Sequence, residues 1–208
     1  MSAAGFVLFD MNGVLYRFDT ALRLRLLAQA VQMAPDMLQS LWLDSGWEDD
    51  ADAGAYADGE AYLAAFGALI GHRIDRRTWA SAMASALTAN TAVIALAHRI
   101  ARHAGMGLLT NNGPLLRESF ATVAPAVPDL FGAFAHCSAD FRLRKPDGRL
   151  FLAYCAHHAL DPAHVLFIDD SPQHVEGARS VGMTGHHFTG APALEECLLS
   201  LGLIAPEG

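Results

Sequence analysis

Near the amino end, residues 6–15 read Phe6-Val7-Leu8-Phe9-Asp10-Met11-Asn12-Gly13-Val14-Leu15. The first four residues form a short continuous apolar run with aromatic and β-branched members, a pattern typical of a strand buried on both faces. The run stops at Asp10, and the Asn12-Gly13 pair that follows indicates a turn. We therefore predict a buried strand over 6–9 with a carboxylate at its end.

The second half of the chain alternates between two patterns. Short apolar segments indicate strands, and segments with helical spacing lie between them. Strands over 106–110, 134–137, 165–168 and 184–188 are expected, with helices ending near 103, starting at 114, and covering 147–158 and 172–181. This alternation implies right-handed crossovers and a parallel sheet covered on both faces. The predicted fold class is α/β, a Rossmann-like doubly wound parallel sheet; the order of residues 191–208 is left open.

The segment between the first strand and this alternating region has helical spacing throughout. Helix starts are expected at Asp19 or Thr20, Asp36, Asp58 and Asp75, because such side chains cap free amide donors. An all-helical block inserted after the first strand is a cap. The predicted division is a discontinuous core of residues 1–15 and 89–208 with a helical cap over 16–88.

Composition limits the partners and the compartment. A net charge of −8 supplies no basic surface for nucleic acid or an anionic membrane. Cys137, Cys155 and Cys197 are an odd number without Cys-x-x-Cys spacing, which favours reduced thiols, and we expect them in the core. The run over 6–9 is too short for a signal peptide, and no apolar stretch reaches the ~20 residues that span a bilayer. We expect a cytoplasmic protein; its oligomeric state does not follow from the sequence.

Four polar features fall at one predicted edge of the sheet. Asp10, Thr110 and Asp169-Asp170 follow strands, and Lys145 precedes a helix. Lys145 is also the single lysine among fourteen basic residues, which favours a site that needs a compact ammonium group. Taken alone, Asp10 could cap a turn, Thr110 could simply end a strand, and Asp170 could cap the helix that follows. Lys145 alone could be the one lysine that an arginine-rich composition left by chance. Together they predict a site, because ligands of open parallel sheets bind beyond the carboxyl ends of the strands.

The chemistry of this set is coherent. Three carboxylates at one place repel one another unless a hard cation lies among them, and Mg²⁺ prefers oxygen ligands. Asp10 would then present its second oxygen to phosphorus as a nucleophile and form an aspartyl-phosphate. Lys145 and Thr110 would stabilise charge on the phosphoryl oxygens.

In this order the motifs resemble those of the haloacid dehalogenase superfamily. They are Phe9-Asp10-Met11-Asn12-Gly13-Val14-Leu15, Leu109-Thr110-Asn111, Lys145-Pro146 and Phe167-Ile168-Asp169-Asp170. The inserted helices resemble the C1-type cap of subfamily IA. The motif details look most like the branch of glucose-1-phosphate phosphatases and the phosphatase domain of soluble epoxide hydrolases.

The resemblance implies a role for each of these residues. Asp10 would be the nucleophile, Thr110, Asn111 and Lys145 would bind phosphate, and Asp10, the carbonyl of Asn12, Asp169 and Asp170 would hold Mg²⁺. The expected substrate is a small phosphorylated metabolite.

Asn12 departs from the pattern of the superfamily. Its phosphatases usually carry an aspartate at this place, which protonates the leaving group, whereas an amide cannot surrender a proton near neutral pH. General acid catalysis contributes ~10²–10⁴ in rate, so we predict a slow phosphatase or one with altered chemistry. The alternatives are a phospho-ligand-binding or regulatory protein without catalysis and, less favoured because of the Asp169-Asp170 pair, a haloacid dehalogenase.

Trp47 and the histidines give weaker indications of function. Trp47, in the predicted cap, would either contact the leaving group of the substrate or pack within the cap. The ten histidines show no His-x-x-x-His spacing, and the adjacent pairs His157-His158 and His186-His187 are expected to point apart. We therefore predict surface or partly buried histidines without a metal role.

Overall fold

A parallel five-stranded sheet forms the centre of the computed structural model, which describes residues 5–206. The strand order is β5-β4-β1-β6-β7, and every neighbouring pair is parallel, as predicted. The strands are β1 (Phe6–Phe9), β4 (Gly105–Thr110), β5 (Ala135–Cys137), β6 (Val165–Asp169) and β7 (Thr184–His187). Because the chain winds from β1 toward β5 and then crosses to β6, the winding direction reverses at β1, where ligands of such sheets bind.

Alternate residues of β1 pack into the two layers of helices. Phe6 and Leu8 face a cluster formed with α9, whereas Val7 and Phe9 belong to the larger core that includes α6, α8 and α11. This alternation follows from the two-residue period of a strand and explains the continuous apolar run. The helices around the sheet are α6 (Thr91–Ile100), α7 (Pro114–Val123), α8 (Ala126–Phe131), α9 (Gly148–His157), α10 (Pro172–Arg179) and α11 (Ala191–Ser200).

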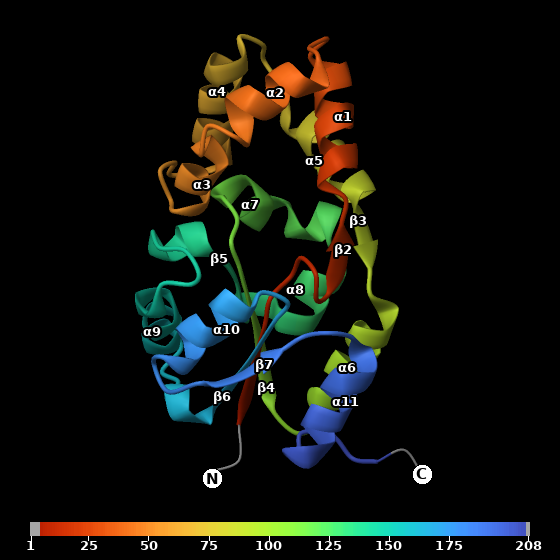
Figure 1. The fold of residues 1–208 in the computed structure, drawn as a ribbon, viewed down its shortest axis with the longest axis vertical. Helices are drawn as coiled ribbons and strands as arrows, with labels where there is room; N and C mark the ends of the chain where they lie inside the picture. Colours follow the sequence, from red (N-terminus) through yellow and green to blue (C-terminus); the bar gives the residue numbers. More distant parts are fainter. Residues whose placement is uncertain (1–4, 207–208) are drawn as a thin grey trace.

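A second group of helices lies beyond the carboxyl ends of the strands, at the top of Figure 1. It consists of α1 (Thr20–Ala30), α2 (Pro35–Trp42), α3 (Trp47–Asp52), α4 (Gly59–Ile70) and α5 (Arg76–Ala86). Its chain connections form an antiparallel ribbon of β2 (Tyr16–Phe18) with β3 (Leu87–Ala89), which the sequence analysis did not predict. The division into a core and a cap at residues 16 and 88 stays a prediction.

Helix capping accounts for most of the predicted starts. The side chains of Asp19, Asp58 and Asp75 accept hydrogen bonds from backbone amides three residues later, as expected of N-caps. The start predicted at Asp36 is wrong, because α2 begins at Pro35 with Ala34 as its N-cap. Proline is favoured there, since the first amides of a helix lack partners within the helix.

The carboxyl-terminal segment, whose order the sequence left open, contains α11. Leu194 and Leu198 are fully buried, and their spacing of four residues places them on one helical face. Three short 3₁₀ helices complete the fold: η1 (Gly132–Phe134), η2 (Ser138–Phe141) and η3 (Pro162–His164). Cys137 and Cys155 are buried and Cys197 is half-buried, all as free thiols. Within residues 5–206, every helix is too short or too polar to cross a bilayer.

Candidate active site

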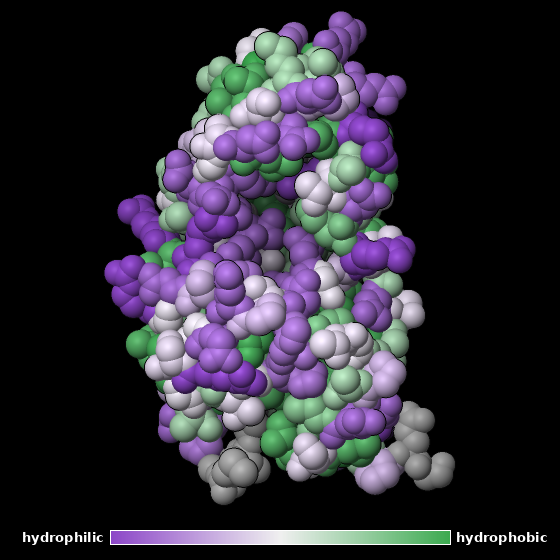
Figure 2. Space-filling model, viewed as in Figure 1, coloured by the Kyte–Doolittle hydropathy of each residue, from purple (hydrophilic) through white to green (hydrophobic). Residues whose placement is uncertain are grey.

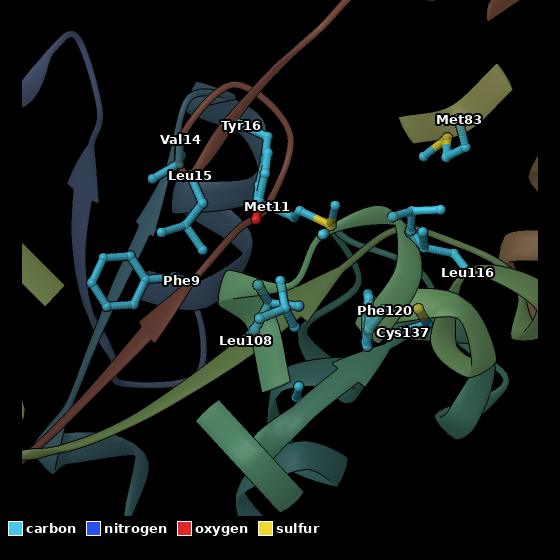
Figure 3. Close-up of a cluster of buried hydrophobic side chains, with 14 of the residues drawn as sticks. Phe9, Met11, Val14, Leu15, Tyr16, Met83, Leu108, Leu116, Phe120 and Cys137 are labelled. Atoms are coloured by element: carbon cyan, nitrogen blue, oxygen red, sulfur yellow. The ribbon is translucent and has the colours of Figure 1, made fainter. Parts of the chain in front are cut away.

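The loop after β1 places Asp10 at the edge of the sheet. The amide of Asp10 donates to the carbonyl of Ile168 at 2.9 Å, which continues the pairing of β1 with β6. Met11 is fully buried, and Figure 3 shows its side chain directed from the loop toward Leu116. Gly13 has a φ of 90°, and a Cβ there would lie 2.2 Å from Oδ2 of Asp170. The loop therefore requires glycine, for its backbone conformation and for the close approach of Asp170.

Lys145 joins two of the predicted carboxylates. Its Nζ donates to Oδ1 of Asp10 at 2.6 Å and to Oδ2 of Asp169 at 2.7 Å. All three side chains are buried, with Lys145 only 1% exposed. Asp170 is exposed, yet one oxygen of each of Asp10, Asp169 and Asp170 lies within 4.8 Å of the others. The structure thus brings together the four ionisable residues that the sequence placed at one sheet edge.

Burial and charge shift the ionisation of this group. Burial raises the pKa of Asp10 to about 6, although Lys145 opposes the rise. Burial acts in the same direction on Asp169, but hydrogen bonds with His174 and Lys145 bring its pKa below the ordinary value. Burial disfavours the ammonium of Lys145, but the charges of Asp10 and Asp169 outweigh this effect and raise its pKa. Lys145 is therefore a fixed positive charge at neutral pH.

Thr110, the last residue of β4, and the two asparagines that follow it organise the loops around the site. Thr110 is buried, and its Oγ1 accepts from Nδ2 of Asn112 at 2.9 Å. The side chain of Asn111 bonds both backbone groups of Lys145: Oδ1 accepts from the amide at 2.9 Å, and Nδ2 donates to the carbonyl at 3.0 Å. Asn111, predicted to bind substrate, thus positions Lys145. Sequence reasoning missed Asn112, although its place two residues after the end of the strand was a usable signal.

His174 is a second residue that the sequence analysis missed. Its Nδ1 lies 3.0 Å from Oδ1 and 3.1 Å from Oδ2 of Asp169, and the amide of Ser171 donates to the same Oδ1 at 2.8 Å. These contacts orient a fully buried carboxylate whose other oxygen bonds Lys145. The available signal was the position of His174 in the first turn of the helix that follows the Asp169-Asp170 pair.

Asn12 and Trp47 have different surroundings. Asn12 is half-buried, and its Oδ1 is buried without a hydrogen-bond partner among the described residues. Trp47 packs within α1–α5, where its ring contacts Tyr56, Tyr62 and Phe66 at centroid distances of 5.2, 5.1 and 5.5 Å. These contacts give Trp47 a packing role, and a contact with substrate stays a prediction.

The helices over residues 20–86 close onto the sheet edge. Arg144, next to Lys145, pairs with Asp49 at 2.6 Å, and Oγ of Ser138 donates to the carbonyl of Asp52 at 2.7 Å. Figure 2 shows a hollow between the two parts of the molecule, surrounded by hydrophilic residues. A pocket of about 720 Å³ is lined by Asn12, Gly13, Asp170 and residues of the β2–β3 ribbon. Asp170 is therefore accessible from the solvent, and Asp10 and Asp169 lie buried behind it.

The residues present suit a hard divalent cation. Three carboxylates and one ammonium leave two negative charges at the site (−3 + 1 = −2). Their donors are oxygen atoms, which Mg²⁺ prefers, and Asn12 brings a further oxygen without a partner. A divalent cation would balance the charge at this edge.

Comparison with known proteins agrees with this fold. The architecture is that of an α/β protein with acidic residues at the switch point of a parallel sheet. A family model described as a hydrolase, haloacid dehalogenase-like hydrolase, matches residues 6–182, so the chain belongs to the haloacid dehalogenase-like hydrolase family. The predicted superfamily is confirmed, whereas subfamily IA and its branch stay predictions.

Relatives of several kinds resemble the chain. Flavin mononucleotide hydrolase 1 of Arabidopsis thaliana is 35% identical over 71 residues, which cover 34% of this chain and only 29% of that protein. A predicted HAD-like hydrolase from Porphyromonas gingivalis superposes with a TM-score of 0.77 at 20% identity, covering 95% of this chain and 98% of that one.

An HAD family enzyme from Bacteroides thetaiotaomicron, solved with magnesium and inorganic phosphate, gives a TM-score of 0.69 at 18% identity over 87% of this chain and 92% of its own. L-2-haloacid dehalogenase from Xanthobacter autotrophicus gives 0.60 at 23% identity over 97% and 84%. These structures establish the shared fold.

Proposed function

We propose that the protein is a Mg²⁺-dependent phosphatase that acts on a small phosphorylated metabolite through an aspartyl-phosphate at Asp10. The observation that carries this proposal is the buried bridge from the ammonium of Lys145 to Asp10 and Asp169, beside the third carboxylate of Asp170. An ammonium and a divalent cation on either side of one carboxylate suit a phosphoryl group, whose charge develops on its oxygens.

Asp10 is well placed to act as the nucleophile. Its Oδ1 accepts from Lys145, which leaves Oδ2 to attack phosphorus. The bond from Oδ2 to phosphorus forms while the bond to the leaving oxygen breaks, and the electron pair leaves with that oxygen. A water molecule then attacks phosphorus, which releases inorganic phosphate and the Asp10 carboxylate. Thr110 and Lys145 hold the phosphoryl oxygens through both steps.

Mg²⁺ would be held by Asp10, the backbone carbonyl of Asn12, Asp169 and Asp170, and when bound it polarises the phosphoryl group. Support comes from the oxygen-only donor set and its charge of −2. The magnesium complex of the structural neighbour with the same fold is in line with this assignment.

The amide of Asn12 limits the reaction. It donates a hydrogen bond to the leaving oxygen but supplies no proton, so the alkoxide takes its proton from water. We therefore propose slow turnover of alkyl phosphates, with less loss for acyl phosphates, whose leaving groups need no proton. Trp47 remains our candidate for contact with the leaving group.

Phosphate release from a panel of substrates tests the proposal. The panel contains sugar phosphates, acyl phosphates, FMN and 2-haloacids, and it is run with Mg²⁺ and with a chelator. FMN is included because the curated relative hydrolyses it. Turnover that disappears with chelator and in Asp10→Asn supports the proposal. Saturable phosphate binding without turnover would favour a binding protein, and halide release without Mg²⁺ would favour a dehalogenase.

A variant at Asn12 tests the role of the missing acid. Asn12→Asp should raise turnover of a small alkyl phosphate by ~10²–10⁴, the usual contribution of general acid catalysis, and should change acyl phosphate turnover much less. Equal rates for wild type and variant on the alkyl phosphate would show that position 12 does not limit the reaction. Intact-mass analysis of the wild-type protein controls for deamidation of Asn12.

A further inference from the structure

His136 and the adjacent pair His157-His158 lie close together in space, beside β5. One ring nitrogen from each of His136, His157 and His158 lies within 4.8 Å of the other two. The ring centroids are 5.2 Å apart for His136 and His157, 5.1 Å for His136 and His158, and 4.7 Å for His157 and His158. His136 comes from β5, and the other two end α9.

The expectation that His157 and His158 point apart is wrong. α9 ends at His157, and His158 is its C-cap with φ −104° and ψ 9°, outside the helical conformation. The spacing rule for helical neighbours therefore does not apply to this pair. The rings turn toward each other and meet His136, so the sequence pattern concealed the cluster.

Two of the rings carry buried nitrogens without a partner. Nε2 of His136 and Nε2 of His158 are buried and have no hydrogen bond among the described residues. His136 is only 6% exposed, and a buried polar atom that is left without a partner is destabilising. A cluster of unpaired imidazole nitrogens is explained most simply by a ligand that accepts their lone pairs.

Asp140 fixes the orientation of His136. Its Oδ2 lies 2.7 Å from Nδ1 of His136, so Nδ1–H donates to the carboxylate and Nε2 carries the lone pair. Arg117 holds the same carboxylate oxygen at 3.2 Å. A carboxylate behind a histidine is the usual outer support of a metal-binding imidazole, because it sets the tautomer and raises the basicity of the ligand nitrogen.

We propose that His136, His157 and His158 form a binding site for a divalent transition-metal ion of the Zn²⁺ class, separate from the carboxylate site. Imidazole ligands suit Zn²⁺, Cu²⁺ and Ni²⁺, whereas Mg²⁺ prefers oxygen. Three histidines leave a fourth position of the ion for water.

The three nitrogens, which lie within 4.8 Å of one another, would have to move closer together to bind an ion. Tetrahedral Zn²⁺ at about 2.0–2.1 Å from each nitrogen requires nitrogens about 3.3 Å apart. His157 is exposed and can turn inward without disturbing the core. A bound ion would fasten the edge strand β5 to the end of α9, the helix that begins just after Lys145.

Titration of untagged protein with Zn²⁺ tests this site, with Mg²⁺ in excess to occupy the carboxylates. Wild type should bind one Zn²⁺ saturably by isothermal titration calorimetry, and His157→Ala should lower the affinity at least about tenfold. Asp140→Asn should lower it about 10–100-fold, as for other outer-shell residues. Exposed His98, in the last turn of α6, is the matched control, and His98→Ala should bind Zn²⁺ as wild type does.

Two results would overturn the proposal. One is the absence of saturable Zn²⁺ binding by the wild-type protein, which would leave the rings as an aromatic cluster with Phe134 and Tyr154. The other is unchanged affinity in His157→Ala, an exposed position where folding is not at risk. Asp170→Asn separates the two metal sites, because it should weaken Mg²⁺ binding and leave Zn²⁺ binding intact.

Discussion

Replacing Lys145 with methionine tests the charge balance of the candidate active site. Methionine is close to lysine in length and lacks the ammonium, so the change removes two buried ion pairs with little change in packing. The Lys145 side chain is 1% exposed, and its partners Asp10 and Asp169 are 8% and 0% exposed. Removing one partner from a buried pair costs about 3–5 kcal/mol, because the remaining charges lose their compensation.

The loss of stability in Lys145→Met and its dependence on pH can both be measured. For a chain of this size, a loss of about 3–5 kcal/mol corresponds to a fall in Tm of roughly 6–20 °C. Without the ammonium, the folded-state pKa of Asp10, which burial already raises, rises further, and that of Asp169 loses the lowering effect of Lys145 and rises as well. The folded state then binds more protons, so the deficit of the variant is largest at pH 7 and shrinks as the pH falls toward 4.

Urea unfolding followed by far-ultraviolet circular dichroism, with EDTA present, measures this difference. The control is Arg149→Met, which removes the cation from the solvent-exposed ion pair of Arg149 with Asp147 at the start of α9 and should leave the free energy of unfolding nearly unchanged. Adding Asp10→Asn to Lys145→Met should recover part of the loss. Equal stability of Lys145→Met and wild type at pH 7 would refute the reasoning.

Three further predictions concern the metal site. Burial raises the pKa of Asp10 to about 6, and a cation binds the ionised form, so Mg²⁺ affinity should fall about tenfold per unit below pH 6; isothermal titration that gives a constant affinity from pH 5 to 7 would contradict this. Gly13→Ala should weaken Mg²⁺ binding, because its Cβ would displace Asp170, whereas Gly182→Ala, at a similar φ of 92° in open space, should affect stability alone. Calorimetry on both variants separates the clash from the backbone strain. His174→Ala removes a hydrogen bond to Asp169, which we propose as a Mg²⁺ ligand, and should lower Mg²⁺ affinity about 10–100-fold; an affinity equal to that of wild type would show that the histidine does not support the site.

The sheet and the ionisable part of the site could be predicted because their causes are local in sequence. A strand buried on both faces is apolar throughout, so the strand Phe6–Phe9 and its end before Asp10 could be predicted from the sequence. The carboxyl ends of parallel strands lie at the same edge of a sheet. The proximity of Asp10 and Asp169 could therefore be predicted without knowing any side-chain contact.

The remaining features depend on contacts between distant segments. The β2–β3 ribbon pairs Tyr16 with Ala89, and three-residue strands leave no periodic signal. The hydrogen bond of Asn112 to Thr110 and that of His174 to Asp169 depend on local backbone direction. To predict the orientation of His158, the end of α9 would have to be known to within one residue. Helix ends are the features that a sequence predicts least accurately.

The clamp of Asn111 has a consequence for the loop that carries Lys145. With one side-chain amide, Asn111 satisfies both the backbone N–H and the backbone C=O of Lys145, as a neighbouring strand would. Because Asn111 directly follows β4, these two hydrogen bonds fix the position of Lys145 relative to the sheet. Residues 142–144, which precede Lys145, do not have to hold it in place. We therefore expect insertions or substitutions in that segment to change the surface near the site without moving the ammonium group.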